Sequence, residues 1–225
     1  RENEDTRAAR QRLAESGDFE EALGYYPRKM TFERTMIGHL ARHPGDFAGA
    51  ISAMPSNLQM MFVHAYQSFI FNRILSERIR RGIPIHLPIE GDLILPADRQ
   101  GIPEHGQGVP VSKDNLDLVE KQVRSGRAFV SGVLFGTESE LAEGEMGEIE
   151  RRIIEEEGLQ RDDFMVPPLH KCSSKGTRRE LLSAVKDLRA KADDDSVTFS
   201  FTLNKGCYAT TLLREYLKKD ELMDY

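Results

Sequence analysis

A strand, a tight turn and a helix near the end of the chain carry the residues best suited to chemistry. Lys205 and Gly206 lie in the turn, and Arg214 lies in the helix that follows. A glycine turn at the start of a helix leaves the first amide N–H groups without partners, and the helix dipole adds positive potential there. We therefore expect this stretch to stabilise an anion.

The pattern of apolar residues between positions 196 and 219 predicts these two elements. Apolar residues first alternate with polar ones, which is typical of a strand with one buried face. The alternating residues are Val197, Phe199, Phe201 and Leu203. The spacing then becomes that of a helix buried along one stripe, at Ala209, Leu212, Leu213, Tyr216 and Leu217.

The segment before this strand, Glu180 to Ala192, allows two readings. Leu181, Leu182, Val185 and Leu188 are spaced as in a helix, but only an acidic run, Asp193 to Asp195, would join it to the strand. So short a connection favours an antiparallel hairpin with the acidic run as its turn. We predict the hairpin.

Basic residues gather around this region although the net charge of the chain is -6. Eleven bases and six acids lie between Lys171 and Lys219, whereas eleven acids and three arginines lie between Glu138 and Asp163. On charge alone these are ordinary solvated faces or a surface for phosphate. The bases that lead into the hairpin are Lys171, Lys175, Arg178 and Arg179, joined in the turn by Lys205. They could contact phosphates, and an arginine among them could instead pair with a buried carboxylate from elsewhere in the fold.

A long helix from Ser56 to Gly82 is the other strong prediction. Its first four turns leave almost no polar face, and Gly82 with Pro84 ends it. We expect neighbouring segments to cover this helix nearly all round.

The remaining segments give simpler patterns. The first fifty residues predict short helices, Ala128 to Phe135 a strand, and Glu143 to Glu157 an acidic helix whose outer face meets only water. Five prolines and four glycines exclude helix from Pro84 to Pro110, where Ile89 to Leu95 is typical of a short hairpin or a barrel-like β segment. Proline, serine and glycine in Asp162 to Thr177 indicate a domain boundary.

Several classes of function are disfavoured. A metal site drawn from His170, Cys172 and Cys207 lacks a fourth ligand and a CxxC pair, so we expect no metal. The chain has no GxSxG or HExxH motif. We expect no membrane segment and no secretory signal, and the two cysteines fit a reduced, intracellular protein.

Four stretches in order along the chain carry a family resemblance. They are VHAYQSFIFNRILSERI (Val63 to Ile79), EGDLIL (Glu90 to Leu95), KCSSKGTRRELL (Lys171 to Leu182) and FTLNKGCYATTLLREYLKK (Phe201 to Lys219). Together they resemble the archaeal branch of the TruD family of tRNA pseudouridine synthases. The last stretch is the most specific.

The resemblance implies an α+β fold in which a catalytic domain built on a mixed antiparallel sheet is interrupted by an inserted α/β domain, the TRUD domain. Residues 1–177 would be most of the insertion, and 178–225 the closing strands and helix of the catalytic domain. The implied reaction converts uridine at position 13 of tRNA to pseudouridine in the cytoplasm, with a nucleophilic aspartate and no cofactor. Lys205, Gly206 and Arg214 would form one wall of the active site.

One departure from the family pattern concerns the nucleophile. Its motifs, of the form GxKDxxAxTxQ and NYFGxQRFG, do not occur in the chain. Lys113 and Asp114 are followed by Asn-Leu-Asp-Leu at a helix start, so Asp114 is not accepted as the nucleophile. We expect the aspartate upstream of Arg1, in a missing N-terminal half, and this chain alone to be inactive. The alternative is a non-catalytic RNA-binding or scaffold module of the same fold.

Overall fold

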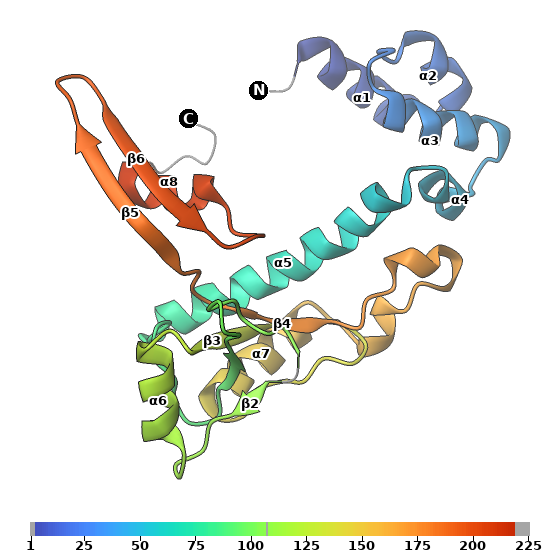
Figure 1. Cartoon of the computed structure of the whole chain (residues 1–225). Helices are drawn as coiled ribbons and strands as arrows, with labels where there is room; N and C mark the ends of the chain where they lie inside the picture. The colour runs from blue at the N-terminus through green and yellow to red at the C-terminus, as the bar shows by residue number, and fades with distance from the viewer. Residues whose placement is uncertain (1–2, 107, 219–225) are drawn as a thin grey trace. The chain divides into compact units, whose positions relative to one another are not determined.

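The architecture is α+β, as predicted, with short antiparallel sheets and helices (Figure 1). The computed structural model describes residues 3–106 and 108–218. The helices, with the 3-10 helices marked η, are α1 (Glu4–Ser16), α2 (Phe19–Tyr25), α3 (Thr31–Arg42), α4 (Phe47–Ser52), α5 (Ser56–Arg80), α6 (Leu116–Arg124), α7 (Gly144–Glu156), η1 (Arg161–Phe164), η2 (Pro167–Cys172) and α8 (Ala209–Leu217). The strands are β1 (Leu93–Pro96), β2 (Val109–Pro110), β3 (Ala128–Leu134), β4 (Thr177–Glu180), β5 (Val185–Ala192) and β6 (Val197–Leu203).

The chain divides into two compact units whose segments alternate along the sequence. The first unit comprises Arg1–Ile70, Phe135–Ser139 and Gly158–Gly176. The second unit comprises Phe71–Leu134, Glu140–Glu157 and Thr177–Tyr225. The last change of unit lies between Gly176 and Thr177, and the earlier changes divide the residues before it between both units. The assignment of 1–177 to an inserted domain is a statement about the family and stays a prediction.

The first unit is helical. Apolar side chains of α1, α2 and α3 form a small core around Ala22 and Ile37. Arg34 strengthens the packing of α3 on α2, because its guanidinium donates to the carbonyl oxygens of Leu23 at 2.9 Å and Tyr26 at 2.7 Å. The short helices predicted for the first fifty residues are therefore confirmed.

The second unit is built on a four-stranded antiparallel sheet in the order β2-β1-β3-β4. Ile94 of β1 pairs with Val130 of β3, and Gly132 of β3 pairs with Arg179 of β4. Val119 of α6 and Phe71 of α5 pack in the apolar clusters around these strands. The strand predicted over 128–135 is confirmed. Of the two alternatives for 89–95, strand β1 fits the β segment and the hairpin is wrong, because β1 pairs with β2 and β3.

Two buried ion pairs fix this unit internally. Arg78 of α5 contacts both carboxylate oxygens of Asp92, at 2.6 and 2.9 Å, and both side chains are fully buried. Arg178 of β4 donates to Glu150 of α7 at 2.8 Å and to the hydroxyl of Ser131 at 2.8 Å. Removing one partner of such a pair leaves the other charge buried without compensation.

The acidic helix α7 differs from its prediction. Its outer face was expected to meet only water, but Glu156 pairs with Arg73 of α5 at 2.7 Å, and Glu157 just beyond the helix contacts the same arginine. Glu150 lies inside the fold. The charge run is therefore partly a docking surface for α5, since the basic residues of that helix neutralise it.

Because of Glu77 on α5, we predict that the second unit becomes less stable in acid. Partial burial raises the pKa of its carboxyl group, but Arg81, Arg152 and Arg80 lower it by more, so the pKa lies below its ordinary value of 4.5. The stabilisation is therefore complete above that value and is lost as the pH falls through the lower folded pKa. In urea unfolding, the difference between the free energies of unfolding of the unchanged protein and of Glu77→Gln should become smaller as the pH is lowered from about 6 to about 3. A difference independent of pH would contradict this.

We predict that substitution of Gly91 strongly destabilises the protein. Its φ of +92° is unfavourable for other residues, and a β-carbon there would overlap the carbonyl oxygen of Glu143. Gly91→Ala should lower the free energy of unfolding by about 2 kcal/mol or more. The control is Gly126→Ala, where φ is +70° and no atom lies within 4 Å of the added carbon. Chemical unfolding should show the larger loss for Gly91→Ala, and equal losses would show that the contact with Glu143 does not matter.

Candidate nucleic-acid interface

The strand, turn and helix at 196–219 form as predicted over their described part, which ends at Lys218. β6 pairs with β5 in the predicted hairpin, and Asp193 N donates to Ser196 O across its turn. Gly206 adopts a φ of +90° in the turn before α8. The rings of Phe199 and Tyr216 lie 4.7 Å apart between centroids, which joins β6 to α8. The predicted change from strand to helix period is confirmed, whereas Lys219 lies outside the described residues.

Two residues in and just after β4 contact the turn that precedes α8. The guanidinium of Arg179 donates to the carbonyl oxygen of Gly206 at 3.1 Å. The hydroxyl of Ser183, just after β4, lies 3.2 Å from the thiol of Cys207. The structure therefore brings Arg179 together with the Lys205–Gly206 turn, 27 residues away along the chain.

Lys205 lies in the turn just before α8, whereas Arg214 lies in the last turn of that helix. Lys205 is exposed in the turn, and Arg214 is partly buried on α8. The residue before α8, Tyr208, provides no side-chain cap for the helix amides. Cationic side chains next to such a helix start stabilise a phosphate or a carboxylate supplied from elsewhere. What this arrangement can do by itself is bind and orient an anion.

Arg178 does not belong in the RNA-contacting set. Its side chain is 2 % exposed. Its donors are used by Glu150, by Ser131 and by the carbonyl oxygen of Glu140 at 2.9 Å. Of the two roles that the sequence allows for these arginines, Arg178 takes the pairing with a buried carboxylate and not the phosphate contact. The alternation of β4 turns Arg178 inward and leaves Arg179 partly exposed.

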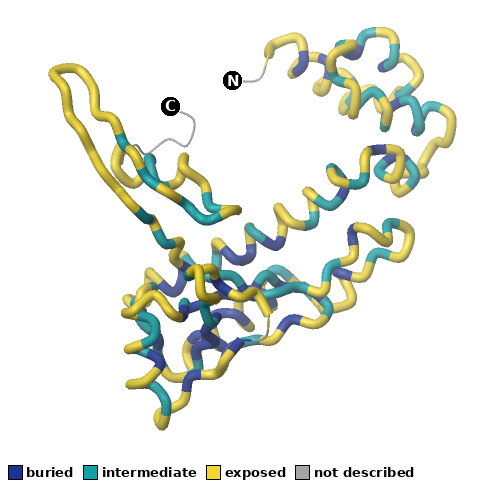
Figure 2. Tube along the Cα trace, viewed as in Figure 1, coloured by how far each residue is buried: buried dark blue, intermediate teal, exposed yellow. Residues whose placement is uncertain are grey.

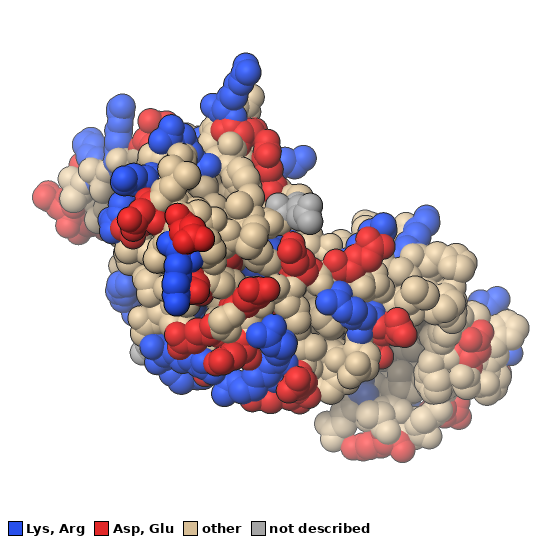
Figure 3. All heavy atoms as spheres, turned by 90° about the horizontal axis from the view of Figure 1, so that it is seen from below, with Lys and Arg blue, Asp and Glu red and all other residues tan. Residues whose placement is uncertain are grey.

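The two other predicted RNA contacts lie in the first unit. Lys175 is exposed and pairs with Glu138 at 3.0 Å. Lys171 is exposed in η2, where it lines a pocket of about 400 Å³ together with His170, Gln59 and Ser56. Basic and acidic side chains are interspersed on the face shown in Figure 3.

A histidine–carboxylate pair in the second unit was missed by sequence reasoning. His105 Nε2 lies 2.7 Å from a carboxylate oxygen of Glu180, the residue after Arg179. Lys186 of β5 donates to the carbonyl oxygen of Gln100 at 2.9 Å. These two contacts connect the loop that contains Gln100 and His105 to β4 and to the hairpin. No spacing links His105 to a residue 75 positions away, so the sequence offers no signal for this contact.

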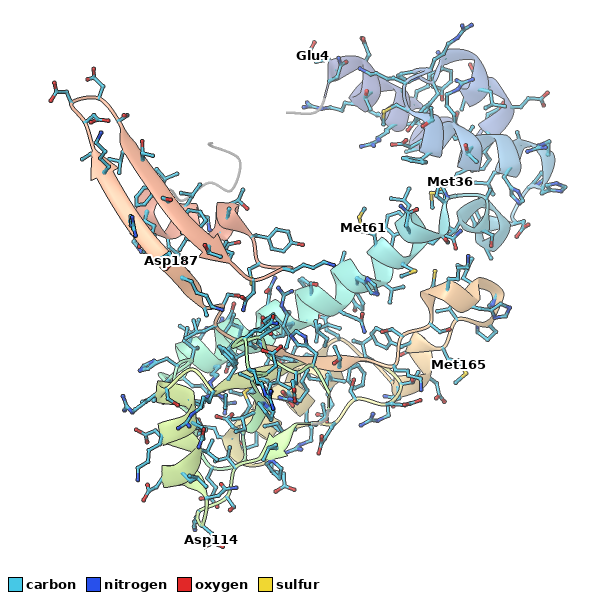
Figure 4. All side chains as sticks on the ribbon, viewed as in Figure 1. Glu4, Met36, Met61, Asp114, Met165 and Asp187 are labelled. Carbon is cyan, nitrogen blue, oxygen red and sulfur yellow. The ribbon has the colours of Figure 1, made fainter. Side chains whose placement is uncertain are left out.

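The residues that the sequence did not support, as a nucleophile or as metal ligands, do not come together into a site in the described part of the chain. Asp114 is exposed in the turn before α6 (Figure 4). His170 and Cys172 belong to the first unit and Cys207 to the second. Within residues 3–106 and 108–218, no group of three or more histidine, cysteine, aspartate or glutamate side chains could hold a metal ion. Of the helices described, none is long and apolar enough to cross a membrane.

The hairpin and α8 expose large apolar side chains in this chain (Figure 2). The exposed residues are Val185, Leu188, Val197, Tyr208, Tyr216 and Leu217. Large exposed apolar side chains in such number are typical of an interface with a further segment or partner.

Comparisons with known proteins agree on one family. The model of tRNA pseudouridine synthase D (TruD) matches residues 1–216. A probable tRNA pseudouridine synthase D of Methanococcoides burtonii is 41% identical over 98% of this chain and 52% of its own length. One of Methanopyrus kandleri is 42% identical over 96% of this chain and 47% of its own length.

A solved structure extends the comparison to the fold. The crystal structure of a protein described as tRNA pseudouridine synthase D from Methanosarcina mazei is 39% identical to this chain and superposes with a TM-score of 0.90. The match covers 97% of this chain and 51% of that one. The chain therefore spans about half the length of the relatives it matches.

Proposed function

We propose, because this chain belongs to the tRNA pseudouridine synthase D (TruD) family, that it is the C-terminal part of a tRNA pseudouridine synthase. The complete enzyme would convert uridine at position 13 of tRNA to pseudouridine in the cytoplasm. The observation that carries the proposal is the match over residues 1–216 together with a span of about half the relatives' length. We call the longer polypeptide, which includes the absent aspartate motif, the full-length polypeptide.

The role proposed for this chain is to bind tRNA and to complete the active site. Lys205, Gly206 and Arg214 would form one wall of the uridine pocket, facing a phosphate or the nucleophilic aspartate. The exposed Lys205 in the turn before α8 supports this role, because a cation there favours a negative partner. The apolar surface of the hairpin would receive the rest of the catalytic sheet.

The domain assignment is part of the same proposal. Residues 178–225 would close the catalytic domain, and residues 1–177 would form most of the inserted domain. A target base within folded RNA must leave its stack to reach an active site, which costs unstacking energy. Backbone contacts from Lys171, Lys175, Arg179 and Lys205 would offset part of this cost.

The proposed chemistry uses side chains alone. The aspartate would form a transient covalent bond to the nucleotide and be released again. The bond from N1 of the base to C1′ breaks, the base rotates, and a bond forms from C5 to C1′. C5 then loses its proton and N1 gains one, so the net change is an isomerisation. The residues of this chain hold the RNA and the charge of the aspartate. No step draws on a metal or an organic cofactor.

Binding measurements test the RNA contacts directly. In the full-length polypeptide, Lys171→Ala and Lys205→Ala should each weaken tRNA binding and reduce the slope of log K against log salt by about 1, because each removes one phosphate contact. The control is Lys113→Ala, a surface lysine 4.0 Å from Glu90 that is outside the proposed set. Fluorescence anisotropy at several salt concentrations gives both quantities. Slopes equal to that of the control would remove the tested lysine from the interface.

A further inference from the structure

Helix α5 carries a second exposed apolar surface, separate from the hairpin. Four large side chains lie along one side of its first half, and three of them are aromatic (Figure 4 labels Met61). Their exposed fractions are 56% for Met61, 52% for Phe62, 39% for Tyr66 and 47% for Phe69. Spacings of four and three residues place Phe62, Tyr66 and Phe69 on adjacent turns of one helix face, and Met61, one residue before Phe62, flanks that face. We call this surface the α5 stripe.

The opposite side of the same helix is covered. Gln59, Gln67, Ile70 and Ile74 are buried. The amide of Gln67 donates to the carbonyl oxygen of Phe135 at 2.7 Å and to the hydroxyl of Ser174 at 2.9 Å, within the first unit. The described chain therefore covers this side, by hydrogen bonds to its glutamines and by packing on its isoleucines, and leaves the α5 stripe exposed. A helix that is apolar all round is normally buried all round.

The chemistry of the α5 stripe favours a protein occupant over RNA. No lysine, arginine, aspartate or glutamate occurs between Phe47 and Asn72. RNA interfaces need cationic groups for the phosphates, whereas protein interface cores are poor in charge and rich in aromatic residues and methionine. The rings of Tyr66 and Phe69 are stacked at 6.0 Å, so they present one continuous aromatic surface.

We infer that the α5 stripe docks against the part of the full-length polypeptide that lies outside these 225 residues. The inference rests on the proposed function, which supplies this occupant. Relatives that match over 98% of this chain are matched over 52% of their own length, so about half of such a polypeptide is available to cover the stripe. A second copy of the chain and a single-stranded segment of tRNA are the competing occupants.

Photocrosslinking in the full-length polypeptide separates these occupants. p-Benzoylphenylalanine replaces Phe62 or Phe69, which keeps an aromatic ring at each position and so preserves the fold. The control places the same residue at Lys113, in a surface turn whose side chain is 82% exposed. Samples mix isotopically light and heavy protein, with and without tRNA, and crosslinked peptides are identified by mass spectrometry.

We expect crosslinks from positions 62 and 69 to reach peptides outside the 225 residues within the same molecule, at least about tenfold more abundant than those from position 113. Crosslinks between light and heavy copies would overturn the inference in favour of self-association. Crosslinks to tRNA, or yields no higher than at position 113, would overturn it equally. Pseudouridine is measured in the same preparations, so a failed activity with the expected crosslinks would refute the proposed function alone.

Discussion

Glu150→Ala will lower the free energy of unfolding of the second unit by about 3 to 5 kcal/mol, because it leaves Arg178 buried without its counter-charge. The carboxylate of Glu150 accepts from Arg178 at 2.8 Å, from the amide of Ala142 at 2.7 Å and from the amide of Val133 at 3.2 Å. All three donors lose their partner together. Urea unfolding followed by circular dichroism measures the loss.

Two control variants test whether the loss of stability in Glu150→Ala arises from the burial of its ion pair with Arg178. The double variant Glu150→Leu with Arg178→Met removes both charges and keeps similar volume, so it should be less destabilised than Glu150→Ala. Glu120→Ala breaks the exposed pair with Arg124 and should cost less than about 1 kcal/mol. If Glu150→Ala costs no more than Glu120→Ala, the buried pair does not stabilise the fold.

Arg214→Ala in the full-length polypeptide will lower the rate of pseudouridine formation by at least about 100-fold, because it removes a preorganised cation from the wall of the proposed pocket. Its tRNA affinity should fall much less, since most binding contacts remain. Single-turnover assays and binding measurements on one preparation separate the two effects.

The control for this experiment is Arg124→Ala. Arg124 lies on the surface of the same unit and pairs with Glu120 at 2.7 Å, away from the proposed wall. Its loss should leave the rate unchanged. A rate for Arg214→Ala equal to that of Arg124→Ala would remove Arg214 from the active site.

The parts predictable from sequence are those with a clear period. The alternation from Val197 to Leu203 and the spacing from Ala209 to Leu217 predicted β6 and α8 within a residue or two. The short acidic connection correctly favoured β5 over a helix, because three residues at Asp193 to Asp195 suit a hairpin turn.

The contacts that sequence could not predict depend on pairing across the fold. Arg178 and Arg179 are adjacent and chemically alike, and only the register of β4 against β3 turns one inward to Glu150 and the other toward Gly206. The pair of His105 with Glu180 arises in the same way. Local pattern carries no information about which distant carboxylate meets a given cation.

The helix α5 illustrates a prediction that was right about the element and incomplete about its surroundings. Its apolar pattern predicted cover nearly all round, yet Phe62 and Phe69 are exposed in this chain. An apolar pattern shows that a surface is buried in the complete assembly, and it does not show which segment buries it. The exposed hairpin and the α5 stripe both fit a chain that folds with a further part of the same polypeptide.

The most direct test of the account is pseudouridine at position 13 of a tRNA transcript after incubation with the full-length polypeptide or with these 225 residues alone. Mass spectrometry and chemical mapping of the modified nucleotide give the readout. The account predicts conversion by the full-length polypeptide and none by the 225 residues, because they lack the aspartate motif. Conversion by the 225 residues, or no conversion by the full-length polypeptide, would contradict it.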